Sequence, residues 1–119
     1  MITVTYVKNK RLTLTITGHA GADEKGQDLV CGAASMLAYT LAQNIRDAER
    51  LGIVSRVEIK LDEGDSVISC TPKREYREAV AVIYNVIRRG YDLLAANYGD
   101  FIKIVYSGGN RNINKESPT

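Results

Sequence analysis

The sequence of 119 residues has no tryptophan, two prolines and two cysteines. No apolar run approaches the roughly 18 residues that a membrane-spanning helix needs. The first ten residues alternate apolar and polar side chains, which is unlike a signal peptide. Two cysteines do not make a disulfide framework. We therefore expect a cytoplasmic protein with free thiols and no membrane contact.

An excess of charge of one sign is also missing. Sixteen Lys and Arg residues stand against 14 Asp and Glu residues, so the formal net charge is only +2. A small, scattered charge does not favour a nucleic-acid partner. One histidine and two cysteines are too few to close a metal site, and the glycines lack the spacing of a phosphate-binding loop. We expect neither a metal nor a cofactor.

The periodicity of apolar residues predicts two helices and five strands. Alternation of period two predicts strands over residues 2–8, 11–17, 55–62, 66–70 and 100–106. Helical spacing predicts one helix over 29–51 and a second that begins near Pro72 and ends near Asn97. The order ββαββαβ indicates an α+β fold, with a single sheet packed by two helices. We expect one domain over residues 1–106 and a disordered tail over the polar residues 107–119.

The second predicted helix has an apolar stripe that we expect to face the sheet. Its members recur at intervals of three and four residues, which places them on one side of a helix. They are Tyr76, Ala79, Val80, Ile83, Val86, Ile87, Tyr91 and Leu94.

The stretch from Gly18 to Ser35 holds the residues best suited to chemistry. His19, the single histidine, follows a predicted strand, and Cys31 lies just inside a predicted helix. With Asp28 as N-cap, Cys31 would lie in a first turn whose amide groups and dipole favour a thiolate. Ser35, one turn later, could orient the thiol. A nucleophile–base pair and a packed cysteine beside a surface histidine both fit this pattern.

Other polar or reactive residues have simpler interpretations. Cys70 lies in a predicted strand and is expected to pack in the core. Asp62, Glu63 and Asp65 are typical of a solvated turn. Residues 20–27 are small, charged or glycine, so we expect a mobile loop that leaves His19 and Cys31 unbonded until a peptide binds.

A longer motif runs through the same stretch. A block G-H-A is followed by a glycine-containing loop, then G-Q-D-L-V-C and a serine one turn later. This block resembles the ribosomal-processing cysteine protease family, Prp. The element order and the segment N-Y-G-D-F-I-K-I near the end also resemble the family, so the likeness covers nearly the whole domain. The matching positions of the block are Gly18, His19, Ala20, Gly26, Gln27, Asp28, Leu29, Val30, Cys31 and Ser35.

The resemblance implies a homodimeric cysteine endopeptidase. Members of this family remove a short N-terminal extension from large-subunit ribosomal protein twenty-seven during ribosome maturation. Carried over to this sequence, Cys31 is the nucleophile and His19 the general base. Asp28 and Ser35 are supporting residues, and Gly18 frames the histidine. Two alternatives remain open: a phage-type relative that processes a capsid or scaffold protein, and a non-catalytic dimer that binds a protein partner.

Overall fold

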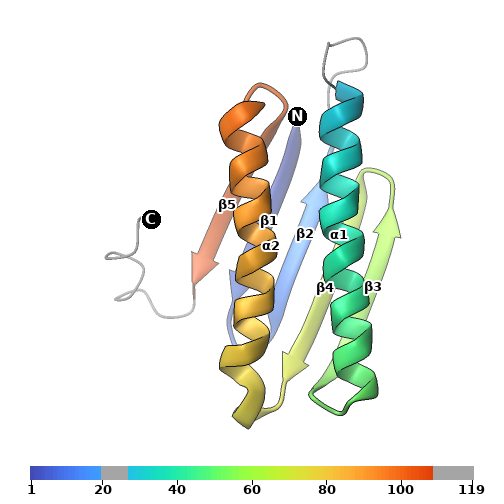
Figure 1. The fold of residues 1–119 in the computed structure, drawn as a ribbon, viewed down its shortest axis with the longest axis vertical. Coiled ribbons are helices and arrows are strands. Elements are labelled where there is room, and N and C mark those ends of the chain that lie inside the picture. Colours follow the sequence, from blue (N-terminus) through green and yellow to red (C-terminus); the bar gives the residue numbers. More distant parts are fainter. Residues whose placement is uncertain (20–26, 109–119) are drawn as a thin grey trace.

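The computed structural model describes residues 1–19 and 27–108. For Gln27 and Asp28 it describes the backbone but not the side chains. The two helices lie side by side on one face of a single sheet (Figure 1). This arrangement confirms the predicted α+β class and the order ββαββαβ. Neither helix in the described ranges is long and apolar enough to cross a membrane. The elements are β1 (Ile2–Lys8), β2 (Leu12–Thr17), α1 (Gln27–Arg50), β3 (Val54–Asp62), β4 (Asp65–Pro72), α2 (Arg77–Asn97) and β5 (Ile102–Gly108).

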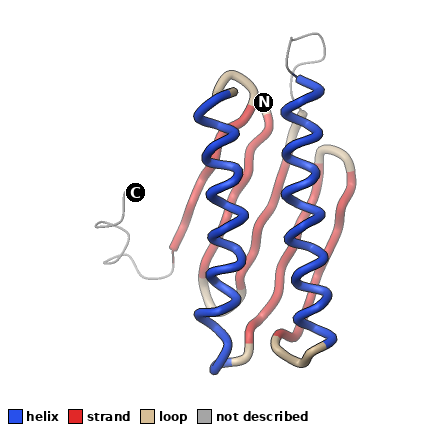
Figure 2. Tube along the Cα trace, viewed as in Figure 1, coloured by secondary structure: helices blue, strands red, loops and turns tan. Residues whose placement is uncertain are grey.

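The sheet is mixed and has the strand order β3-β4-β2-β1-β5. β1 and β2 form the predicted antiparallel hairpin, β2 and β3 each pair antiparallel with β4, and β5 pairs parallel with β1. Figure 2 shows the strands of the sheet behind the helices. β3, at one edge, has a register shift between Ser55 and Glu58, where Arg56 adopts a φ of 53°. Such a bulge interrupts the regular pairing of a strand.

Alternation along the strands separates a buried face from an open one. Ile2, Val4 and Tyr6 of β1 point toward the helices and are buried. The intervening Thr3 and Thr5 belong to the opposite face, which neither helix covers (Figure 1). α1 packs on the buried face through an apolar stripe that includes several alanines, which allow a helix to lie close to a sheet. The buried residues of α1 are Val30, Ala34, Ala38, Leu41, Ala42, Ile45 and Ala48.

Several element ends differ from the prediction. α1 begins at Gln27, so Asp28 lies inside its first turn and the predicted N-cap role is wrong. An acidic residue in that turn is still favoured by the helix dipole. Pro72 ends β4 opposite Val54 instead of opening α2, because the end of a strand tolerates the missing N–H of proline. β5 continues through Gly108. The loop predicted to be mobile covers residues 20–27, but Gln27 is the first residue of α1, and residues 20–26 lie outside the described residues. The tail predicted to be disordered covers residues 107–119, but Ser107 and Gly108 belong to β5, so the prediction is wrong for these two residues; residues 109–119 lie outside the described residues.

The packing face of α2 is rotated from the predicted stripe. Val86 is 62% exposed, and Tyr76 and Ala79 are also exposed. Tyr84, which the apolar pattern omitted, is fully buried. The ring of Tyr84 stacks on Tyr6 of β1 with ring centroids 5.5 Å apart. The aromatic contact with the sheet therefore determines which face of α2 points inward.

Three buried tyrosines differ in what their hydroxyl groups contact. The hydroxyl of Tyr84 donates to the Ile68 carbonyl oxygen at 3.1 Å, and that of Tyr91 donates to the Ala34 carbonyl oxygen at 2.8 Å. The Tyr6 hydroxyl finds no hydrogen-bond partner among the residues that the structure describes. Burial raises the pKa of all three phenols, so they stay protonated at neutral pH.

We predict that replacing these tyrosines by phenylalanine has unequal effects on the free energy of unfolding. Tyr84→Phe and Tyr91→Phe should each lower it by about 1 kcal/mol, because each removes a buried hydrogen bond. Tyr6→Phe should leave it unchanged or raise it, since the lost hydroxyl has no partner to abandon. Urea unfolding followed by circular dichroism measures all three. If the three variants lost equal amounts of unfolding free energy, the difference in hydrogen bonding between Tyr6 and the other two tyrosines would be contradicted.

Candidate active site

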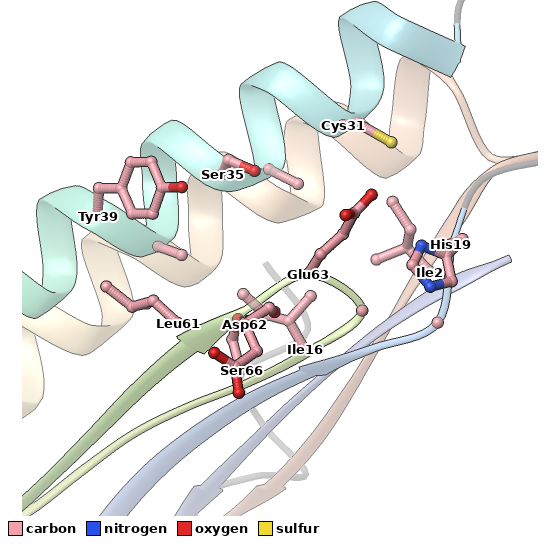
Figure 3. Close-up of a pocket in the computed structure, with 14 residues that line it drawn as sticks. Ile2, Ile16, His19, Cys31, Ser35, Tyr39, Leu61, Asp62, Glu63 and Ser66 are labelled. Carbon is pink, nitrogen blue, oxygen red and sulfur yellow. Dashed lines mark hydrogen bonds between the residues drawn. The ribbon is translucent and has the colours of Figure 1, made fainter.

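A cleft of about 340 Å³ opens where β2 ends and α1 begins (Figure 3). Its walls come from the ends of β1 and β2, from one face of α1, and from the turn between β3 and β4. Four of the five residues singled out in the sequence line it, namely Gly18, His19, Cys31 and Ser35. The cleft thus brings together groups from separate elements of the fold.

His19 follows β2 after one intervening residue, Gly18, and the main chain of these two residues is held from two sides. The amide nitrogen of Gly18 donates to the Gly64 carbonyl oxygen at 3.1 Å. The Met1 nitrogen donates to the His19 carbonyl oxygen at 2.6 Å. Gly18 itself has a φ of +92°, and any side chain there would overlap the Met1 carbonyl oxygen. Only glycine fits this position, so Gly18 fixes the path of the chain into the histidine.

Cys31 is the fifth residue of α1 and is half-buried. Its sulfur points from the helix into the cleft (Figure 3). Since α1 begins at Gln27, the amide groups of residues 27–29 have no intrahelical partner, and Cys31 comes two residues after the last of them. The predicted place of Cys31 among those amides is therefore wrong by two positions. The side chain of Asp28 lies outside the described part of the chain.

Ser35 and Tyr39 continue the row that Cys31 begins. The three residues are spaced four apart on α1 and line the same cleft (Figure 3). Tyr39 is 52% exposed. The sequence interpretation missed it, although the same spacing that selected Ser35 predicts the next position on this face.

The turn between β3 and β4 forms the opposite wall. Asp62, Glu63 and Gly64 line the cleft, and the Glu63 carboxylate points toward Cys31 (Figure 3). Asp62 and Glu63 are exposed, as predicted for a solvated turn. The turn is in addition part of the candidate site, which the sequence did not predict. It reaches the cleft because β2 pairs with β4, which sets Thr17 opposite Asp65.

Cys31 and His19 line the same cleft. Within residues 1–19 and 27–108, no hydrogen bond joins the Cys31 sulfur to the His19 ring. Together with the Ser35 hydroxyl they supply a nucleophile, a proton acceptor and a hydrogen-bond donor around a single opening.

Cys70 has the opposite environment. Its side chain is fully buried in β4, and its sulfur lies 3.7 Å from the Tyr84 hydroxyl oxygen. Burial raises the pKa of the Cys70 thiol. The predicted packing role of Cys70 is confirmed.

The chain is similar to known cysteine proteases in sequence and fold. Residues 1–103 match the family described as cysteine protease Prp. SMU.848 from Streptococcus mutans is 26% identical, with a TM-score of 0.66 over 91% of this chain and 95% of that one. The essential ribosomal processing protease Prp from S. aureus, solved with a substrate peptide, is 22% identical, with a TM-score of 0.66 over 90% of this chain and 100% of that one. A second S. aureus Prp structure, with a covalently linked product peptide, has the same identity and coverage and a TM-score of 0.64. A search of curated proteins finds no match.

We predict that iodoacetamide modifies the folded protein once per chain, at Cys31. The Cys31 sulfur opens into the cleft, whereas Cys70 is buried and its raised pKa keeps it a thiol. Intact-mass and peptide mass spectrometry measure the number and place of adducts. Guanidinium-unfolded protein, in which both cysteines are exposed, is the control and should take two. Modification of both residues at similar rates in the folded protein would contradict the prediction.

Proposed function

We propose that this chain, which belongs to the cysteine protease Prp family, is an endopeptidase with Cys31 as its nucleophile and His19 as its general base. The observation that carries the proposal is their shared cleft, which the two residues line from different elements. A packed cysteine and an unrelated surface histidine would have no reason to face the same opening. The family match supports a thiol nucleophile, and Cys70 is too deeply buried to serve as one.

The groups in the cleft fit a two-step hydrolysis. The Cys31 thiolate attacks the scissile carbonyl carbon, and the protonated His19 ring gives its proton to the departing amine. A thioester then joins Cys31 to the amino-terminal product. Water attacks this thioester while His19 takes a proton from it, and the acid product leaves. The covalently linked product peptide of the S. aureus relative supports a covalent step.

Three further residues support this chemistry. Gly18 determines the backbone path that leads to His19, because only glycine fits so close to the Met1 carbonyl oxygen. Ser35 is placed to orient the thiol or a substrate carbonyl from the next turn of α1. Asp28, in the first turn, favours the start of the helix that carries Cys31.

We propose that the substrate is the N-terminal extension of large-subunit ribosomal protein twenty-seven. The S. aureus relative is described as a ribosomal processing protease and was solved with a substrate peptide. Ile2, Ile16 and Leu61 give the cleft apolar walls that suit an apolar side chain next to the scissile bond. Such a substrate would place the enzyme in the cytoplasm, where ribosomes mature.

We also propose that the chain forms a homodimer, as the family resemblance implies. A groove of about 440 Å³ runs between α1 and α2 on the side away from the sheet, and almost all of its lining is apolar. Met36 is 62% exposed there and Leu93 66%. Large apolar side chains gathered on one surface are typical of an interface, and a second copy would cover them.

We predict that the wild-type protein cleaves a peptide spanning the extension of this ribosomal protein and that Cys31→Ala abolishes cleavage. Cys31→Ser should be nearly as inactive, because a serine hydroxyl is far less ionised. His19→Ala should lower kcat by about 10²-fold to 10⁴-fold, as expected for loss of a general base. Mass spectrometry of the products measures the rate and the bond cleaved.

The matched control for these variants is Gly32→Ala, also on α1 but with open space around the new methyl group, which should keep wild-type activity. Retained cleavage by Cys31→Ala would overturn the proposal. Cleavage of phage capsid or scaffold peptides alone would keep the chemistry and replace the substrate. Binding without cleavage of any peptide would favour the non-catalytic dimer.

We predict that Leu93→Asp shifts the protein from dimer to monomer in solution. In the dimer, the second copy would remove water from the new carboxylate, and none of the described residues that line the groove carries a positive charge to compensate. Burying such an unpaired charge is unfavourable, so the dimer should dissociate. Light scattering coupled to size-exclusion chromatography gives the mass. Leu51→Asp, at a position that is 72% exposed and outside the groove, is the control and should stay dimeric. A wild-type protein that is monomeric at high micromolar concentration would refute the dimer.

A further inference from the structure

The ring of His19 rests directly on the backbone of Gly64, in the turn between β3 and β4. A methyl group added to Gly64 would lie 2.5 Å from Nε2 of His19, 2.7 Å from Cε1 and 3.3 Å from Cδ2. Real methyl groups do not approach ring atoms so closely. The ring therefore occupies the space that a side chain at position 64 would need.

The turn that carries Gly64 is itself firmly held. The Ser66 hydroxyl donates to the Asp62 carbonyl oxygen at 3.0 Å, and the Lys60 ammonium pairs with the Asp65 carboxylate at 2.6 Å. The Gly64 carbonyl oxygen accepts the Gly18 amide, one residue before the histidine. The contact between ring and turn is thus supported by hydrogen bonds in both segments of the chain.

We infer that Gly64 is a positioning residue for His19: it forms the surface against which the imidazole is held in the cleft that it shares with Cys31. This inference rests on the proposed role of His19 as general base. A side chain at position 64 would push the ring away from its place. Misplacing a catalytic group by about 1 Å can cost about 100-fold in rate, so the effect should appear in kcat.

The backbone conformation of Gly64 has to be separated from the contact with the ring. Gly64 has a φ of +74°, which alone favours glycine. Gly52 has a φ of +75°, but a methyl group there would meet only the Lys73 ammonium, at 3.7 Å. Gly52→Ala therefore carries the same conformational cost as Gly64→Ala without the collision, which makes it a matched control.

The first measurement is steady-state cleavage of the ribosomal-protein peptide by the two variants. Both should lose a similar amount of thermal stability. Gly64→Ala should lower kcat by about tenfold to 100-fold with KM within about threefold of the wild type. Gly52→Ala should keep kcat within about twofold. Equal kcat values in the two variants would overturn the inference.

The second measurement does not depend on activity and uses the fact that the chain has one histidine. The His19 ring gives a single set of imidazole signals in NMR spectra. Gly64→Ala should shift these signals, whereas the spectrum of Gly52→Ala should superimpose on that of the wild type. Unchanged signals in Gly64→Ala would show that the ring does not rest on this residue.

The wild-type protein supplies a test should Gly64→Ala fail to fold. The Hα protons of Gly64 should show nuclear Overhauser effects to the His19 ring and a ring-current shift. Their absence would overturn the inference. Their presence in a protein that cleaves no peptide would instead overturn the proposed function, and with it the catalytic meaning of the contact.

Discussion

The register between β2 and β4 determines where the candidate site lies. With Thr17 opposite Asp65, the next residue of the chain, Gly18, reaches the carbonyl oxygen of Gly64. The same ladder sets Leu14 opposite Ile68, and both side chains are fully buried. A slip of one residue would turn these side chains to the open face of the sheet. Burial of the core therefore secures the geometry of a cleft that lies at the end of the sheet.

Local patterns were sufficient to predict most of the fold. Alternation and helical spacing depend on neighbours in the sequence, so the order of elements and the β1–β2 hairpin could be read directly. The inward face of α2 could not. The hydroxyl group of Tyr84 makes it equally compatible with a buried or an exposed position in the sequence. In the structure the Ile68 carbonyl oxygen of β4 accepts a hydrogen bond from this hydroxyl, so the group can be buried without losing its partner. Val86 looks like a core residue and lies exposed.

The candidate site was predictable in part, for a similar reason. His19 and Cys31 stand out because their residue types are scarce in this chain. The wall made by Glu63 and Gly64 did not stand out, since an acidic turn with glycine is typical of solvent-exposed hairpins. Its membership of the site follows from the pairing of β2 with β4, a choice of partner strand that no local pattern encodes. The start of α1 was also missed, because several residues before Leu29 are compatible with a first helical turn.

The bulge in β3 has a consequence for how the protein meets extended polypeptides. The outer edge of β3 presents main-chain groups that an extended peptide could join as an additional strand. The irregularity between Ser55 and Glu58 breaks that row of groups, and the exposed charges of Arg56 and Lys60 oppose close approach of apolar segments. Only the short regular stretch nearer the cleft is left to pair. The irregularity therefore limits how far an extended polypeptide could pair along this edge of the sheet, and interrupted edges of this kind are less open to aggregation.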